Sequence, residues 1–109
     1  MKSCLVIVSS SPSSVQAVRG LQTASDLQSK GGVSVMLIQD AVLGALKRSR
    51  LSERLMQLTS RGTSIYVLAE HLHKRGFLAH DLLEKVKIAD YGQLVEFMMD
   101  EETSTIGVF

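Results

Sequence analysis

The chain has 109 residues, of which 45% are hydrophobic and 21% charged, a balance typical of one folded globular domain. Its formal net charge of +1 lies too close to neutral for a general nucleic-acid binder. The chain has no run of about 18 apolar residues, the length that a membrane-spanning helix needs. The single cysteine excludes an internal disulfide, so we expect a cytoplasmic protein.

Short apolar runs separated by polar segments predict the strands. The first run, SCLVIV, is apolar without interruption, which is typical of a strand covered on both faces. It is also too short to be the apolar part of a signal peptide. The predicted strands cover residues 3–8, 33–38, 64–68, 86–88 and 105–109.

Apolar residues at helical spacing fill the segments between these strands. The predicted helices cover residues 13–29, 41–46, 52–58, 69–75 and 91–99, with a single turn at 81–84. Strand and helix therefore alternate along the whole chain, and this order is typical of a parallel sheet with helices on both faces. We expect a three-layer α/β/α fold, with a mainly parallel five-stranded sheet, as one domain over residues 1–109.

Turn and capping residues indicate where the helices begin and end. Ser11 and Asp40 are expected to accept hydrogen bonds from the first turns of the helices that follow them, with Pro12 inside the first turn of one. Glycines at 31–32, 62 and 76 are expected to end helices. Two acidic residues, each with Glu or Gln three positions later, predict capped helix starts: Asp81 with Glu84, and Asp90 with Gln93.

Polar side chains gather where the first three predicted strands end. Because the carboxyl ends of parallel strands meet at one edge of a sheet, we expect these residues to line a crevice there. The candidate crevice residues are Ser9, Ser10, Ser11, Gln39, Asp40, Glu70 and His71.

The chemistry of this crevice stays open at the level of the sequence. The serine run over 9–14 could hold an anion on backbone amides, but it lacks the glycines of a phosphate-binding loop, and a turn with a helix cap is the favoured explanation. His71 and His73 would point to different helix faces, and no cysteine joins them, so we expect no metal site. No nucleophile, base and orienting group can be assembled, so no catalytic residue and no cofactor are predicted.

Three further features have simple structural explanations. Cys4 lies in the first strand, where burial would leave its thiol unreactive. Met36, Met56, Met98 and Met99 occupy positions expected in the core. Charge is concentrated in a basic cluster and an acidic one, which are either solvated helix faces or complementary patches used in assembly. The basic cluster is Lys47, Arg48, Arg50, Arg54 and Arg61; the acidic cluster is Asp100, Glu101 and Glu102.

Several segments in matching order resemble the DsrE/DsrF/DsrH family, and the nearest likeness is to its DsrH/TusB branch. The strand-to-helix segment VMLIQDAV, followed by LGAL, is the most recognisable of them. The others are SSSP after the first strand, IYVLAEHLHKRGF, IADYGQLVEFM and TIGVF at the end of the chain. The resemblance thus covers essentially the whole chain.

This resemblance implies a small cytoplasmic α/β protein in a sulfur-relay assembly, which serves either thiolation of the tRNA wobble uridine or sulfur oxidation. The sulfur-carrying cysteine of relatives would fall in the segment after the third strand or on the first helix. Residues 68–71 (LAEH) and 18–21 (VRGL) contain none. We therefore expect a structural or regulatory subunit, bound to DsrE/DsrF-like sister subunits or to itself, with at most indirect contact to tRNA. The alternative is a stand-alone homo-oligomeric domain that binds a small ligand at the strand ends.

Overall fold

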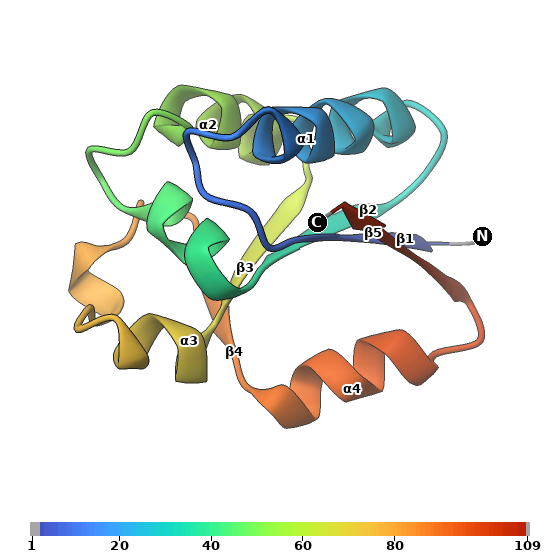
Figure 1. Cartoon of the computed structure of the whole chain (residues 1–109). Coiled ribbons are helices and arrows are strands. Elements are labelled where there is room, and N and C mark those ends of the chain that lie inside the picture. Colours follow the sequence, from blue (N-terminus) through green and yellow to red (C-terminus); the bar gives the residue numbers. More distant parts are fainter. Residues whose placement is uncertain (1–2, 109) are drawn as a thin grey trace.

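The computed structural model describes residues 3–108 and has a five-stranded sheet with helices on both faces (Figure 1). The strands are β1 (Ser3–Val8), β2 (Val33–Leu37), β3 (Ser64–Leu68), β4 (Lys87–Ala89) and β5 (Thr103–Val108). The α-helices are α1 (Val15–Gln28), α2 (Ser52–Ser60), α3 (Ala69–Lys74) and α4 (Tyr91–Met99). Two 3₁₀ helices are η1 (Gln39–Ala45) and η2 (Ala79–Asp81).

The sheet has the strand order β4-β3-β2-β1-β5, and all its strand pairs are parallel. The predicted α/β class is therefore confirmed. The chain moves from β1 through β2 and β3 to the edge strand β4, and α4 then carries it back across the sheet to β5. The strand order reverses between β1 and β5, and Ser9–Ser11 follow β1 at this point. Phe109, which the sequence places in the last strand, lies outside the described residues.

The two faces of the sheet are covered unequally (Figure 1). Helices α1 and α2 lie on one face and enclose the main core, where Val6, Val35 and Ile65 are completely buried. On the other face α4 lies over a small cluster built on Leu5, Ile7, Met36 and Ala89. No residue of α4 is itself buried. The fold thus has one thick side and one thin side.

The helix starts differ from the sequence predictions in three places. Ser14, and not Ser11, caps α1: its Oγ accepts a hydrogen bond from the amide of Ala17 at 3.1 Å. Asp40 caps nothing, because it lies inside η1, which winds as a 3₁₀ helix and not as the predicted α-helix. Asp81 does not open a turn at 81–84; it ends η2, and its carboxylate accepts from the amide of Leu78 at 2.9 Å.

Other predicted boundaries are confirmed. Asp90 and Gln93 form the expected capping box at the start of α4, with hydrogen bonds of 2.8 and 3.0 Å. Gly62 and Gly76 follow α2 and α3 with φ of +98° and +84°, a backbone conformation that favours glycine.

The methionine prediction is largely wrong. Met36 is buried, but Met56, Met98 and Met99 are 58%, 50% and 78% exposed. Met56 lies on α2, and the other two lie on α4. The apolar character of a residue in a helix does not specify whether it faces the sheet or the solvent when the helix is thinly covered.

Candidate functional site

The carboxyl ends of β2 and β3 are joined by a hydrogen bond between two of the predicted crevice residues. Each strand passes directly into a helix there: Gln39 is the first residue of η1, and His71 lies in the first turn of α3. The backbone amide of Gln39 donates to Nδ1 of His71 at 2.8 Å. The register of the two strands, which pairs Leu37 with Val67, brings these helix starts side by side.

This hydrogen bond fixes the protonation state of His71. A ring nitrogen that accepts from a backbone amide carries no proton, so the imidazole is neutral with its proton on Nε2. Nε2 lies 2.9 Å from the hydroxyl oxygen of Tyr91 and therefore donates to it. The two rings meet edge to face, with centroids 5.6 Å apart. His71 thus joins α3 to both η1 and α4.

The surroundings of His71 favour the neutral form. Burial lowers the pKa of His71 below its ordinary value of 6.5, and the charges of Arg75 and Lys74 lower it further, while Glu70 acts in the opposite direction. The lowered pKa agrees with the hydrogen bonds, because protonation at Nδ1 would break the contact with Gln39.

Gln39 has a φ of +49°, which is unusual for a residue with a side chain. Such left-handed conformations cost about 1–2 kcal/mol and persist where surrounding contacts hold them. Here the contact is the bond from the Gln39 amide to His71. The tight turn at the end of β2 therefore depends on a side chain supplied by the neighbouring strand's helix.

Asp40 and Glu70 each bind a group from another element. Nη2 and Nε of Arg75 lie 3.0 and 3.3 Å from the same carboxylate oxygen of Asp40, and Nη1 of Arg75 donates to the carbonyl of His71 at 3.1 Å. Glu70 accepts from the amide of Tyr91, the first residue of α4, at 3.3 Å. An acidic group at a helix N-terminus is favourable, because the free amides there carry partial positive charge.

These residues surround an open depression of about 480 Å³, lined by Gln39, Asp40, His71, Lys74 and Arg75. It offers two cations, one carboxylate and a neutral imidazole, and its lining contains no hydroxyl or thiol nucleophile. The arrangement is suited to recognising a polar or anionic group, and it does not assemble the parts of a covalent catalyst.

The serines of the predicted crevice form a loop of their own beside this cluster. They follow β1, which pairs with β2, and the amide of Ile38 donates to the carbonyl of Val8 at 2.9 Å. The hydrogen bonds of Ser11 go to Ser13 and Ser14 in the same loop. Shared hydrogen-bond partners thus join Gln39, Asp40, Glu70 and His71, and Ser11 has no part in them.

Tyr91 and Arg75 complete the cluster, and neither is among the crevice residues that the sequence predicts. Both had a detectable signal. Arg75 is four residues after His71, one helical turn away, and Tyr91 directly follows Asp90, the predicted cap at the end of the fourth strand.

Cys4 lies in β1, at the opposite end of the strands from the cluster. It pairs with Val33 and Ser104 near the amino ends of the parallel strands, whereas the cluster lies at their carboxyl ends. Four residues separate Cys4 from the end of β1, which corresponds to about 13 Å of extended strand. The thiol is partly buried, and burial raises its pKa.

Residues 3–108 contain neither a cluster of metal ligands nor a membrane-spanning helix. No three His, Cys, Asp or Glu side chains lie close enough together to hold a metal ion. No helix in this range has the length and apolar character needed to cross a membrane.

The fold and the cluster define a small parallel α/β domain with a polar, non-nucleophilic site at its strand ends. Residues 10–104 match the family described as "DsrH like protein". The chain therefore belongs to the DsrH-like family of sulfur-relay proteins, as its sequence resemblance indicated. No curated protein matches it.

Two solved structures share this fold over nearly the whole chain. One is a protein of unknown function, MTH1491, from Methanobacterium thermoautotrophicum, with a TM-score of 0.88 and 17% sequence identity. The other is the ychN protein from E. coli, with a TM-score of 0.88 and 16% identity. In both comparisons the alignment covers 98% of this chain and 99% of the other. At these identities the likeness establishes the fold alone.

Proposed function

We propose that this chain is a structural, DsrH/TusB-like subunit of an intracellular sulfur-relay assembly, in which other subunits carry the sulfur. Its partners are DsrE/DsrF-like sister chains, and any contact with tRNA is made through them. The observation that carries the proposal is the position of the one thiol: Cys4 is partly buried at the amino edge of the sheet, away from the strand-end cluster. A relay needs a thiolate that a partner's persulfide can reach.

The segments where relatives carry the relay cysteine support the proposal as well. After β3, the side chains of Glu70 and His71 are committed to hydrogen bonds with α4 and η1. On α1, a Cβ at Gly20 would lie 2.6 Å from Cγ2 of Val8, which is completely buried. A side chain does not fit there unless β1 or α1 moves. Both segments contribute packing or hydrogen bonds in this chain.

Persulfide transfer to the purified chain tests the proposal. The chain is incubated with a cysteine desulfurase and cysteine, and intact mass spectrometry detects any added sulfur atom on Cys4. The matched control is Glu70→Cys in a Cys4→Ser background, which places one thiol at an exposed position beside the cluster. We expect the control to take up sulfur and the native chain to remain unmodified. Rapid sulfur uptake by Cys4 at the rate of the control would refute the structural role.

A second candidate function, a stand-alone domain that binds a small ligand, is favoured by one observation. The depression at the strand ends presents Lys74 and Arg75 beside a neutral His71. Calorimetry with small carboxylates and nucleoside phosphates tests it. Saturable binding that Lys74→Gln abolishes supports this function, and absence of binding to the native chain rejects it for these anions.

A further inference from the structure

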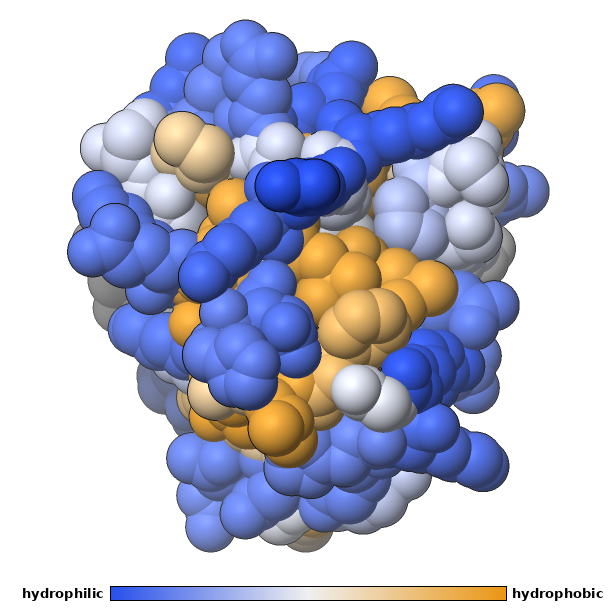
Figure 2. Space-filling view, turned by 90° about the vertical axis from the view of Figure 1, so that its left-hand side faces the viewer, coloured by the Kyte–Doolittle hydropathy of each residue, from blue (hydrophilic) through white to orange (hydrophobic). Residues whose placement is uncertain are grey.

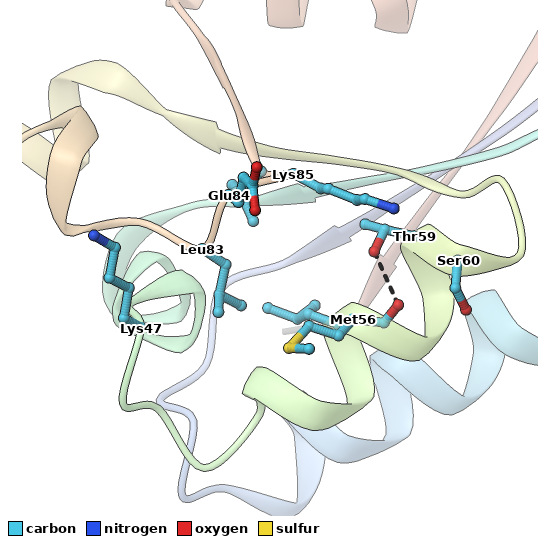
Figure 3. A pocket seen from close by; sticks show the side chains of 9 residues that line it. Lys47, Met56, Thr59, Ser60, Leu83, Glu84 and Lys85 are labelled. Atoms are coloured by element: carbon cyan, nitrogen blue, oxygen red, sulfur yellow. Dashed lines mark hydrogen bonds between the residues drawn. The ribbon is translucent and has the colours of Figure 1, made fainter.

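An apolar groove lies outside the strand-end cluster. It has a volume of about 530 Å³ and runs between α2 and the segment that leads into β4 (Figure 3). Met56 and Leu83 point toward each other across its middle, while Lys47 and Lys85 lie at opposite ends. Figure 2 shows a hydrophobic patch, ringed by hydrophilic residues, on the side of the molecule to which these elements belong.

The groove has a fixed frame. The amide of Leu83 donates to the carbonyl of Ala45 at 2.9 Å, and the amide of Lys47 donates to the carbonyl of Asp81 at 3.1 Å. This short antiparallel contact pairs Leu46 with Leu82 and so fixes the segment that carries Leu83 against the segment that carries Lys47. The groove is thus present before any partner binds, and Met56, which is 58% exposed, can adapt to what enters.

A second apolar surface lies on the opposite side of the sheet, along α4. Tyr91, Val95 and Met98 are about half exposed and follow one another at helical spacing. Met99 is 78% exposed, and Glu101 and Glu102 follow it at the exposed end of the helix. We call residues 98–102 the acidic knob.

The charges of α4 disfavour pairing of this helix with its own copy. Residues 90–102 contain five carboxylates and no lysine or arginine: Asp90, Glu96, Asp100, Glu101 and Glu102. An antiparallel pair of α4 helices would set the acidic knob against Asp90, and a parallel pair would set two knobs together. Like charges facing one another across an interface are costly.

The groove has the complementary character. Its lining carries two lysines, Lys47 and Lys85, against one carboxylate, Glu84. Arg48 and Arg50 are exposed in the loop before α2. Apolar side chains with acidic neighbours thus lie at one end of the molecule, and an apolar hollow with a basic rim lies at the other.

We propose that the acidic knob of one copy docks into the groove of a second copy. The two surfaces cannot meet within one chain, because the groove lies beside the edge strand β4 and the knob directly precedes the opposite edge strand, β5. The contact is therefore head to tail, which builds a closed ring where the rotation allows and a filament otherwise. The proposal does not depend on the sulfur-relay role.

A charge-swap experiment tests this interface by light scattering after size-exclusion chromatography. The groove variant is Lys47→Glu with Lys85→Glu, and the knob variant is Glu101→Lys with Glu102→Lys. We expect the native chain to form oligomers and each variant alone to have the 11.9 kDa mass of one chain. A one-to-one mixture should form oligomers again, since the native groove of the knob variant accepts the native knob of the groove variant, and the two reversed surfaces are complementary to each other.

The matched control is Arg19→Glu with Lys30→Glu, which reverses two exposed charges on and after α1 and should leave the oligomer intact. Circular dichroism verifies that every variant is folded. A monomeric native chain at millimolar concentration, variants that still form oligomers alone, or a mixture that stays monomeric would each overturn the proposal.

Discussion

His71 determines the geometry of the strand ends, because its two ring nitrogens join three elements of the fold. Nδ1 accepts from the Gln39 amide, and Nε2 donates to the Tyr91 hydroxyl. Neither bond requires a charged imidazole, and the first is incompatible with one. The state of this ring should therefore be visible in the pH dependence of stability.

We predict that the protein loses stability as pH falls through 6.5, the ordinary pKa of histidine, toward the lower pKa of His71 in the folded chain. Above 6.5 His71 is neutral in both the folded and unfolded chains, so its contribution is fully present. Below that pH the unfolded chain binds the proton first, which favours unfolding. Urea unfolding at a series of pH values measures the effect, and an NMR titration of the ring reports the pKa directly.

The matched variant is His71→Gln, which keeps an acceptor and removes the titration. Its stability should decline less than that of the native chain over about pH 7 to 5, where an ordinary histidine titrates. A native curve no steeper than that of the variant, or an imidazole pKa above 6.5, would contradict the assignment of a neutral His71.

At the scale of elements, α1 lies so close to β1 that a single methyl group matters. A Cβ at Gly20 would lie 2.6 Å from Cγ2 of the buried Val8. We predict that Gly20→Ala lowers the free energy of unfolding by about 1–3 kcal/mol, the usual cost of overfilling a packed core. Gly32→Ala is the control, because its added Cβ would meet only Ser3 Oγ at 3.6 Å. Equal stability of the two variants in urea would show that α1 and β1 separate easily.

Helix α4 has an inner and an outer apolar side, and substitutions should distinguish them. Phe97 is half-buried and its ring lies 5.2 Å from that of Tyr66 on the sheet, whereas Met99 is 78% exposed. We predict that Phe97→Ala costs about 2 kcal/mol of unfolding free energy, while Met99→Ala changes it by less than about 0.5 kcal/mol in dilute solution. A larger loss for Met99→Ala would mean that the helix packs with its other side inward.

For the molecule as a whole, the sequence predicted the α/β class and the strands, because uninterrupted apolar runs and capping residues such as Asp90 are local signals. It missed what depends on distant partners. Asp40 has the sequence of a helix cap, yet it binds Arg75, which lies 35 positions later. Likewise, the helical spacing of Tyr91, Val95 and Met98 could not reveal that their side of α4 is left exposed.

The candidate site was predicted in the same uneven way. Strand ends are easy to locate, so Gln39 and His71 were selected together. The serines also follow a strand that lies beside β2, because the sheet has the order β4-β3-β2-β1-β5. The hydrogen bonds of Ser11 nevertheless stay within its own loop, and the sequence does not specify which side chains bond across neighbouring strand ends.

The most direct test of the structural-subunit proposal is to purify the tagged chain from its native cell, without reducing agent, and to weigh every chain of the assembly by intact mass spectrometry. The proposal predicts that other chains accompany it, that at least one of them carries an extra sulfur atom, and that this chain has its unmodified mass. Recovery of this chain without any partner, or with the added sulfur on Cys4, would contradict it.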